Sequence, residues 1–151
     1  MNTNDYMLIA INEAKKAYKK NEIPIGAVVV KNGKVVSKAF NCREKKQNAI
    51  FHAETLAIFK ACKKLKSWRL DDCDIYVTLE PCLMCFGAIL NARIKNVYFG
   101  ASATESNGFL NNIKDLNSAI LNHKPNIVGG IEKEKCEELI KNFFKEKTRK
   151  K

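Results

Sequence analysis

The sequence predicts a mixed α/β fold, in which helices cover both faces of a sheet of about five strands. Three observations lead to this prediction. Two apolar segments meet across an Asn-Gly turn, which is typical of a β-hairpin. Two later strand-like segments are each preceded or followed by a helix-like segment, and a helix-like segment stands near each end of the chain. The order hairpin, helix, strand, helix, strand fits a mixed sheet between two helical layers.

Each element has its own local reason. The first helix alternates apolar side chains with lysines, and Asn32-Gly33 is a strong hairpin turn between the first two strands. A loop over 41–51 feeds the next helix. The expected helices are Asp5–Asn21, 53–61, 81–90 and Glu132–Lys147. The expected strands are Ile25–Lys31, Lys34–Phe40, Ile75–Leu79, Lys95–Gly100 and a short one within 125–130.

The chain is expected to form a single domain over residues 1–151, because it contains no repeat, linker or low-complexity segment. That length allows a substantial core. No apolar run approaches a membrane span, and the N-terminus lacks the apolar region of a secretory signal. Six cysteines without such a signal suggest a reducing compartment. The expected location is the cytoplasm, with no membrane partner.

The most informative feature is a split motif, His52-Ala53-Glu54 and Pro81-Cys82-Leu83-Met84-Cys85. It offers three metal ligands, His52, Cys82 and Cys85, and one carboxylate that is not needed as a ligand. Structural zinc sites normally have four protein ligands, whereas three ligands leave a position for water. Zinc lowers the pKa of that water, and Glu54 would carry its proton to a leaving amine. The pattern is that of zinc-dependent base deaminases.

The spacing of the motif places its residues. Residues two apart on a helix point in nearly opposite directions, so His52 and Glu54 fit a helix entrance better than a helix interior. Cys82 and Cys85 are three apart and share one helical face. Pro81 suits the first helical position. Both sulfurs would then lie at a helix N-terminus, whose partial positive charge favours the thiolate form.

Each half of the motif has a less specific interpretation. A lone Cys-x-x-Cys also occurs as a redox pair, as half of a structural zinc site or as two core cysteines, and a lone His-x-Glu is very weak. The two halves together, with a strand leading into Pro81, favour catalytic zinc. The remaining cysteines show no comparable spacing and are expected to be ordinary thiols: Cys42, Cys62, Cys73 and Cys136.

The charge of the chain is compatible with a nucleic-acid partner. The net charge is +11 and the pI about 9.4, which suits a polyanion such as RNA. Lysine greatly outnumbers arginine, so the same charge could reflect an AT-rich genome. The segment 141–151 mixes aromatic and basic residues, and Lys145, Lys147 and Arg149 are possible RNA contacts. The alternative is that Phe143 and Phe144 both pack in the core and the last residues form a solvated tail. We expect Phe143 or Phe144 to be in the core, with the cations that follow still available to RNA.

The chain resembles the bacterial tRNA-specific adenosine deaminases, within the cytidine deaminase-like superfamily. The resemblance covers nearly the whole chain and implies a three-layer α/β/α fold. The two halves of the zinc motif are shared by the superfamily, whereas Ser67-Trp68-Arg69-Leu70, an Asn-His pair and the basic C-terminal helix point to the tRNA enzymes. The segments that carry the resemblance are 22–27, Asn41, 52–54, 67–70, 76–85, 93–94, 98–100, 122–123 and 143–144.

The resemblance also implies a reaction and roles for residues. The reaction is hydrolytic deamination of adenosine to inosine at wobble position 34 of a tRNA anticodon, with tRNA-Arg as the expected substrate. One zinc ion per subunit is expected, and a homodimer through the cysteine helix and its flanks. The implied roles are zinc binding for His52, Cys82 and Cys85, proton transfer for Glu54, contact with the target nucleotide for Asn41, a base-pocket wall for Pro24 and Ile25, and anticodon contact for Asn122.

Some of these residues have simpler interpretations. Asn41 could cap a turn, Ile25 could belong to the core, and Asn122 could belong to a turn before Pro125. The chain also departs from the family. The aspartate expected near Ala103 is missing, Phe51 stands where a small residue is usual, and Asn48-Ala49-Ile50 replaces the usual Pro-Thr segment. These changes affect RNA recognition and leave the zinc motif intact.

Two other functions compete with tRNA deamination. The altered segment around Ala103 would suit a deaminase of a free nucleobase or nucleoside, such as guanine or cytosine, although the basic C-terminus argues against it. A non-catalytic, zinc-stabilised RNA-binding module is also conceivable, but the intact Glu54 argues against it.

Overall fold

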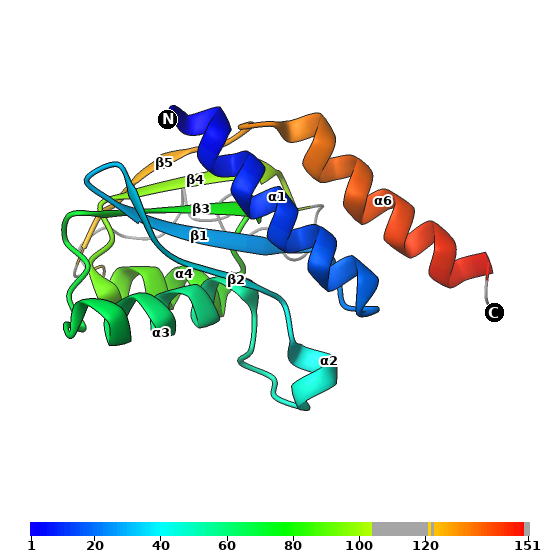
Figure 1. Cartoon of the computed structure of the whole chain (residues 1–151), viewed down its shortest axis with the longest axis horizontal. Coiled ribbons are helices and arrows are strands. Elements are labelled where there is room, and N and C mark those ends of the chain that lie inside the picture. Colours follow the sequence, from blue (N-terminus) through cyan, green and yellow to red (C-terminus); the bar gives the residue numbers. More distant parts are fainter. Residues whose placement is uncertain (104–120, 122, 150–151) are drawn as a thin grey trace.

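A five-stranded mixed sheet forms the middle layer of the computed structural model, which describes residues 1–103, 121 and 123–149. The strand order is β2-β1-β3-β4-β5 (Figure 1). The pairs β2–β1 and β1–β3 are antiparallel, and the pairs β3–β4 and β4–β5 are parallel. The strands are β1 (Gly26–Lys31), β2 (Lys34–Phe40), β3 (Cys73–Leu79), β4 (Asn96–Ala101) and β5 (Asn126–Val128).

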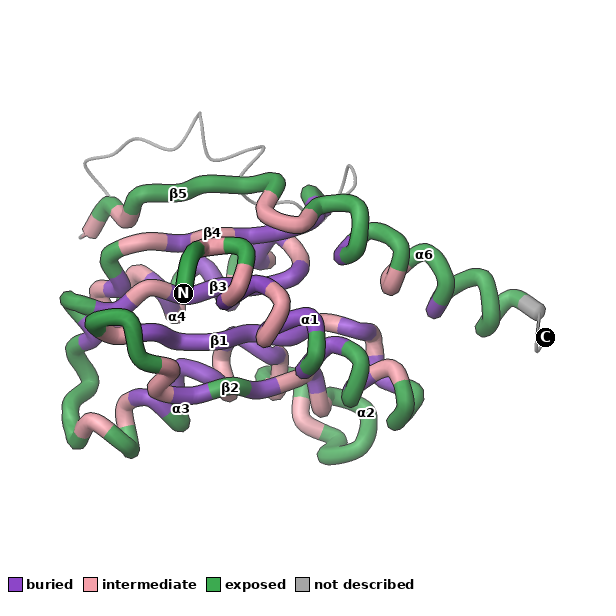
Figure 2. Tube along the Cα trace, turned by 45° about the horizontal axis from the view of Figure 1, so that its top comes forward, coloured by how far each residue is buried: buried purple, intermediate pink, exposed green. Residues whose placement is uncertain are grey.

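Helices cover both faces of this sheet, which confirms the predicted three-layer α/β/α fold. Figure 1 shows α3 (Ala53–Leu65) and α4 (Leu83–Ala92) on one face, and α1 (Thr3–Lys19) and α6 (Lys133–Arg149) on the other. Each face has its own apolar cluster. One lies between α3, α4 and the sheet and the other between α1, α6 and the sheet. Figure 2 shows the central strands β1 and β3 as the most continuously buried part of the chain.

The β1–β2 hairpin has the conformation that its sequence requires. Asn32 and Gly33 both have positive φ, 51° and 75°, as a type I′ turn demands, and Asn and Gly are the residues that tolerate it best. The twist of this turn matches the twist of the strands that it joins. The strand β2 that follows the turn has the predicted bounds, Lys34–Phe40.

The short fifth strand is confirmed and lies at an open edge of the sheet. Its three residues are exposed, as Figure 2 shows. Two side-chain contacts fix the segment: the His123 Nε2 donates to the Ile94 carbonyl at 2.6 Å, and the Asn126 amide donates to Asn96 Oδ1 at 3.0 Å. His123 therefore has a structural partner at this position.

Two local features differ from the prediction. The expected loop over 41–51 contains a short helix, α2 (Arg43–Lys46). The cysteine helix α4 begins at Leu83, with Cys82 as its N-cap in extended conformation, so Pro81 precedes the helix instead of opening it. The extended Cys82 shifts the helix start, which puts one ligand at the N-cap and the other in the first turn. None of the helices in the described part of the chain is both long and apolar enough to cross a membrane.

Candidate active site and metal centre

The site forms where the parallel strands β3 and β4 end and the helices α3 and α4 begin. His52 is the N-cap residue of α3, and Cys82 is the N-cap residue of α4. Neither side chain caps its own helix, so both are free to turn toward the space between the helices. In sheets of this kind, functional sites form at the carboxyl ends of parallel strands. The helix-entrance position predicted for His52 is confirmed.

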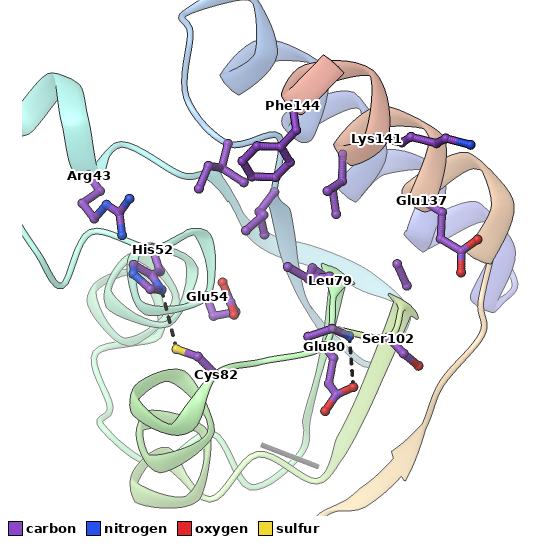
Figure 3. A pocket seen from close by; sticks show the side chains of 15 residues that line it. Arg43, His52, Glu54, Leu79, Glu80, Cys82, Ser102, Glu137, Lys141 and Phe144 are labelled. Atoms are coloured by element: carbon purple, nitrogen blue, oxygen red, sulfur yellow. Dashed lines mark hydrogen bonds between the residues drawn. The ribbon is translucent and has the colours of Figure 1, made fainter. Parts of the chain in front are cut away.

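Three side chains converge there in a geometry that fits zinc. The donor atoms of His52, Cys82 and Cys85 all lie within 4.8 Å of one another. His52 Nδ1 is 3.7 Å from the sulfur of Cys82 and 3.5 Å from that of Cys85 (Figure 3 draws the first contact). A tetrahedral zinc with ordinary bond lengths separates its nitrogen and sulfur donors by about 3.6 Å. The donor set and spacing therefore fit one zinc ion with a fourth position left over.

The protonation of the cysteine pair follows from their contact. A hydrogen bond from Cys85 lowers the pKa of Cys82 to about 4. The same hydrogen bond, together with burial, raises the pKa of Cys85. The hydrogen bond to Cys82 raises the pKa of His52. These contacts favour the thiolate form at Cys82 and the thiol form at Cys85. Zinc binding requires two thiolates and a neutral imidazole, so it releases protons from these groups.

Glu54 lies beside this cluster without belonging to it. Its side chain is in the first turn of α3 and is only 4% exposed. Burial raises the pKa of Glu54 to about 7. Among the residues that the structure describes, no group donates a hydrogen bond to its Oε1. A buried carboxylate with an unpaired oxygen and a pKa near neutrality is suited to accept and return a proton.

These groups form the floor of a pocket of about 670 Å³. That volume lies within the range of about 300–1,000 Å³ typical of small-molecule sites. Five apolar side chains from β3, α6 and the segment before β1 form much of its wall, and Figure 3 shows two of them, Leu79 and Phe144, above Glu54. The five are Ile23, Ile25, Leu79, Ile140 and Phe144. An apolar wall over a polar floor can hold the faces of a flat base while its edge meets the floor.

Helix α6 supplies one side of this pocket. Phe143 is buried and packs edge-on against Tyr18, with ring centroids 5.7 Å apart, whereas Phe144 is 48% exposed and lines the pocket. The prediction that one of the two aromatic residues is in the core is confirmed for Phe143. Lys141 lies on the same side of the pocket (Figure 3).

Two of the residues predicted to bind RNA through this helix, Lys145 and Lys147, are not among the lining residues of the pocket. Lys145 and Lys147 are exposed on α6, and the Lys147 Nζ stands 5.0 Å from the centre of the Phe143 ring. Arg149 is the last residue of α6, and its side chain is outside the described part.

The residues predicted to bind substrate are only partly brought together. Ile25 lines the pocket, whereas Pro24 and Asn41 are buried next to it and are not among its lining residues. The backbone N–H of Asn41 donates to the Ile25 carbonyl at 3.1 Å. In the described part of the chain, the buried Asn41 Oδ1 accepts no hydrogen bond. Asn122 lies outside the described residues.

Sequence reasoning missed several lining residues. Glu80 is buried and accepts a hydrogen bond from the Ala103 N–H at 3.2 Å, and its position directly before Pro81 could have pointed to it. Arg43 and Ser102 also line the pocket. Nothing in the local sequence marks them, because they reach the pocket only through the fold. Ala103 lines the pocket as well, and its side chain is only a methyl group.

Zinc-dependent base deaminases work by setting a proton-shuttling glutamate beside a His-Cys-Cys metal site at the bottom of a base-sized pocket. This fold and this site place the chain in that class of enzyme. A family model described as MafB19-like deaminase matches residues 1–148. The chain is 46% identical over 148 residues to the tRNA-specific adenosine deaminase of Bacillus subtilis (strain 168), covering 97% of this chain and 91% of that protein. It belongs to the family of tRNA-specific adenosine deaminases, among the MafB19-like deaminases.

Two solved structures share this fold. One, from work on A-to-I editing by tRNA:A34 deaminases at the wobble position of transfer RNA, is 34% identical, with a TM-score of 0.85 over 89% of this chain and 98% of that one. A guanine deaminase from Bacillus subtilis is also 34% identical, with a TM-score of 0.68 over 83% of each chain.

Proposed function

We propose that this chain hydrolytically deaminates adenosine to inosine at wobble position 34 of a tRNA anticodon. The observation that carries the proposal is the juxtaposition of the His52–Cys82–Cys85 cluster with the buried Glu54 at the floor of one pocket. The similarity to tRNA-specific adenosine deaminases over nearly the whole chain supports the substrate. The overall reaction consumes adenosine and water and yields inosine and ammonia.

The proposed work of the chain's own residues is binding and proton transfer. Zinc held by the three ligands would lower the pKa of a water molecule and so supply a nucleophile at neutral pH. Glu54 would take a proton from that water and deliver it to the ring nitrogen next to C6. It would then pass the proton of the new C6 hydroxyl to the amino group, which leaves as ammonia. The unpaired Oε1 of Glu54 and its pKa of about 7 suit both transfers.

The walls of the pocket would orient the base. Ile25 and Leu79 offer apolar contact to its faces. The unpaired Oδ1 of Asn41 would accept a hydrogen bond from the target nucleotide, since a buried acceptor without a partner is costly. A wobble nucleotide lies in a loop, where it can leave the stack at little cost and enter the pocket.

The rim of the pocket would contact the rest of the anticodon loop. Phe144 and Lys141 stand on the α6 side, where an aromatic face and a cation suit a neighbouring base and phosphate. Lys145, Lys147 and Arg149 follow on the same helix, and the net charge of +11 favours a polyanion. Asn122 is proposed to touch the anticodon loop and tRNA-Arg to be the substrate, both on the family resemblance.

A homodimer is also part of the proposal. Four large apolar side chains, Ile50, Phe59, Trp68 and Leu83, are exposed on and around α3 and α4. Gly87 on α4 is exposed as well, and a Cβ there would meet no neighbour, so a second chain can approach this helix closely. Four exposed apolar side chains and an open glycine thus support pairing through this face.

Light scattering on the purified protein tests the dimer. It should give twice the mass of the chain, and Phe59→Glu should shift the measured mass toward that of the monomer. A wild-type monomer at micromolar concentration would overturn the dimer and leave the proposed reaction unaffected. The enzyme is proposed to act in the cytoplasm as a single domain.

The first test is inosine formation on an anticodon stem-loop with adenosine at the wobble position. We expect inosine there, and none when the wobble position carries another base. Glu54→Gln protein is the control for contaminating activity. A stem-loop left unchanged by the zinc-loaded wild-type protein would refute the proposal.

A second candidate is deamination of a free base. The similarity to a guanine deaminase and the missing aspartate near Ala103 favour it. Guanine, cytosine and adenosine offered in place of the stem-loop test it. Turnover of guanine or cytosine with the stem-loop untouched would keep the zinc mechanism and replace the substrate.

A further inference from the structure

The helix α2 stands beside the pocket but cannot cap its own N-terminus. Its N-cap residue, Cys42, makes no side-chain cap hydrogen bond. The next backbone donors are satisfied from a distant part of the chain. The N–H of Glu44 donates to Glu22 Oε1 at 3.0 Å, and the N–H of Lys45 donates to Glu22 Oε2 at 2.7 Å. One carboxylate thus replaces the missing cap.

This contact fixes a segment that would not be helical by itself. α2 has only four residues, far fewer than an isolated helix needs in water. Glu22 is 1% exposed, and a buried carboxylate persists where strong hydrogen bonds offset its desolvation. Glu22 directly precedes Ile23, a residue of the pocket wall. Glu22 therefore ties α2 to the wall of the pocket.

The first residue of α2 is Arg43, and it lines the pocket. Among the arginines whose side chains the structure describes, it is the one that does so. Figure 3 shows it on the His52 side, across from Phe144 and Lys141 on α6. Its ion-pair partner is the neighbouring Glu44 at 3.6 Å, and both side chains are largely exposed, at 44% and 62%. Such exposed pairs contribute little, so the guanidinium can exchange this partner for another anion.

We propose that Arg43 binds a backbone phosphate of the RNA strand next to the target nucleotide, and that Glu22 is the positioning residue that holds it there. The inference rests on the proposed function. When the target base reaches the pocket floor, the RNA strand to which it is attached stays at the rim. The strand then passes between α2 and α6. The planar guanidinium matches two phosphate oxygens at once, which a lysine cannot do.

Stem-loops with a single uncharged methylphosphonate at each position flanking the wobble nucleotide test the contact. With unmodified RNA, Arg43→Gln should raise KM about tenfold with little change in kcat, because it removes a charge-assisted hydrogen bond to bound RNA. Arg43→Lys should recover part of the loss. Lys34→Gln, which removes the same charge from the hairpin turn, should match wild type. At one position, the methylphosphonate should raise the KM of the wild-type protein about tenfold and leave the KM of Arg43→Gln unchanged.

Glu22→Gln tests the positioning role. An amide oxygen can still accept one of the two hydrogen bonds, but its NH₂ group faces the other N–H. Hydrogen exchange at the Glu44 and Lys45 amides should become faster, and KM should rise as in Arg43→Gln. The KM of the double variant, Glu22→Gln with Arg43→Gln, should be no higher than that of Arg43→Gln alone. Slower exchange, or fully additive effects, would contradict the positioning role. If Glu22→Gln does not fold, the Arg43 variants still decide the phosphate contact.

The outcomes separate the two proposals. Suppose that wild type forms inosine, that Arg43→Gln has the same KM as wild type, and that the effects of Arg43→Gln and of the methylphosphonate add at every position. This result would overturn the phosphate contact and leave the proposed function standing. If wild type forms no inosine, the proposed function fails. In that case the equilibrium affinities of the same RNAs for wild type and Arg43→Gln decide, and equal affinities would overturn the contact as well.

Discussion

The floor and the rim of the pocket are built differently. The floor, with His52, Glu54 and Cys82 among its groups, is formed at the starts of two helices that pack on the same face of the sheet. The rim, with Arg43, Lys141 and Phe144, is formed by exposed side chains on α2 and α6, which are far apart in the sequence. The floor is buried at Glu54 and half-buried at His52 and Cys82, whereas the rim side chains are exposed and accessible to a large polyanion. Changes in the floor should therefore abolish chemistry, and changes in the rim should affect binding.

The largest effect is expected for Glu54→Gln. Proton transfer by a positioned side chain contributes about 10²–10⁴-fold to catalysis, so inosine formation should fall by about 10³-fold or more. Zinc content should remain near one per chain, since Glu54 is not part of the metal cluster. Glu13→Gln is the matched control, because Glu13 is another buried glutamate but pairs with Lys16 on α1 at 2.6 Å. Loss of zinc from Glu54→Gln would contradict the proton-shuttle role.

Removal of a ligand should abolish metal binding and lower stability together. Cys82→Ala leaves two donors, so zinc should no longer copurify and added zinc should no longer raise Tm. Cys136→Ala removes a buried thiol outside the site and should keep its zinc. Zinc content and thermal unfolding measure both variants. A zinc-replete Cys82→Ala protein would show that the cluster is not the metal site.

The buried carboxylate of the floor should destabilise the metal-free protein at high pH. Burial raises the pKa of Glu54 from 4.5 to about 7, so its contribution to stability is complete below pH 4.5 and is lost as the pH rises through 7. Glu54→Gln is neutral throughout. In chelator-treated protein, its advantage in unfolding free energy over wild type should therefore grow from pH 5 to pH 8, toward about 3 kcal/mol. Urea unfolding at both pH values measures it. A constant difference would mean that Glu54 ionises as freely in the folded protein as in the unfolded one.

The smallest effects are expected at the α6 side of the rim. Lys141→Gln should raise KM about threefold to tenfold without lowering kcat, because removing a surface cation that pairs with a phosphate weakens RNA binding uniformly. Lys145→Gln, one turn further along the same helix and outside the pocket, should have a smaller effect. Initial rates on the stem-loop at several salt concentrations distinguish them. A lower kcat for Lys141→Gln would mean that the rim takes part in the chemistry.

The floor was predictable from sequence because its signals are local. His52 with Glu54, and Cys82 with Cys85, are set by spacings of two and three residues at helix starts, and the structure confirms both entrances. The hairpin at Asn32-Gly33 was equally local. The helix start at Leu83 was missed, because Pro81 fits either just before or just inside a helix.

The rim was not predictable in the same way. α2 was expected to be loop because its four residues carry no helix signal, and its cap comes from Glu22, about twenty residues earlier. Arg43 and Lys141 are far apart in the sequence and line one pocket only in the folded chain. No local sequence pattern predicts that two such distant residues line the same pocket.

By itself, the sequence determined the reaction class of this protein, since a metal motif depends on residue types and short spacings that hold in any fold offering two adjacent helix starts. The tertiary structure alone decided that Glu54 is buried with an unpaired oxygen in the described part of the chain, that Phe143 is core while Phe144 faces the pocket, and that Glu22 accepts hydrogen bonds from the first turn of α2. The physical reason is that burial and long-range hydrogen bonds depend on which surfaces pack together, and packing is a property of the whole chain.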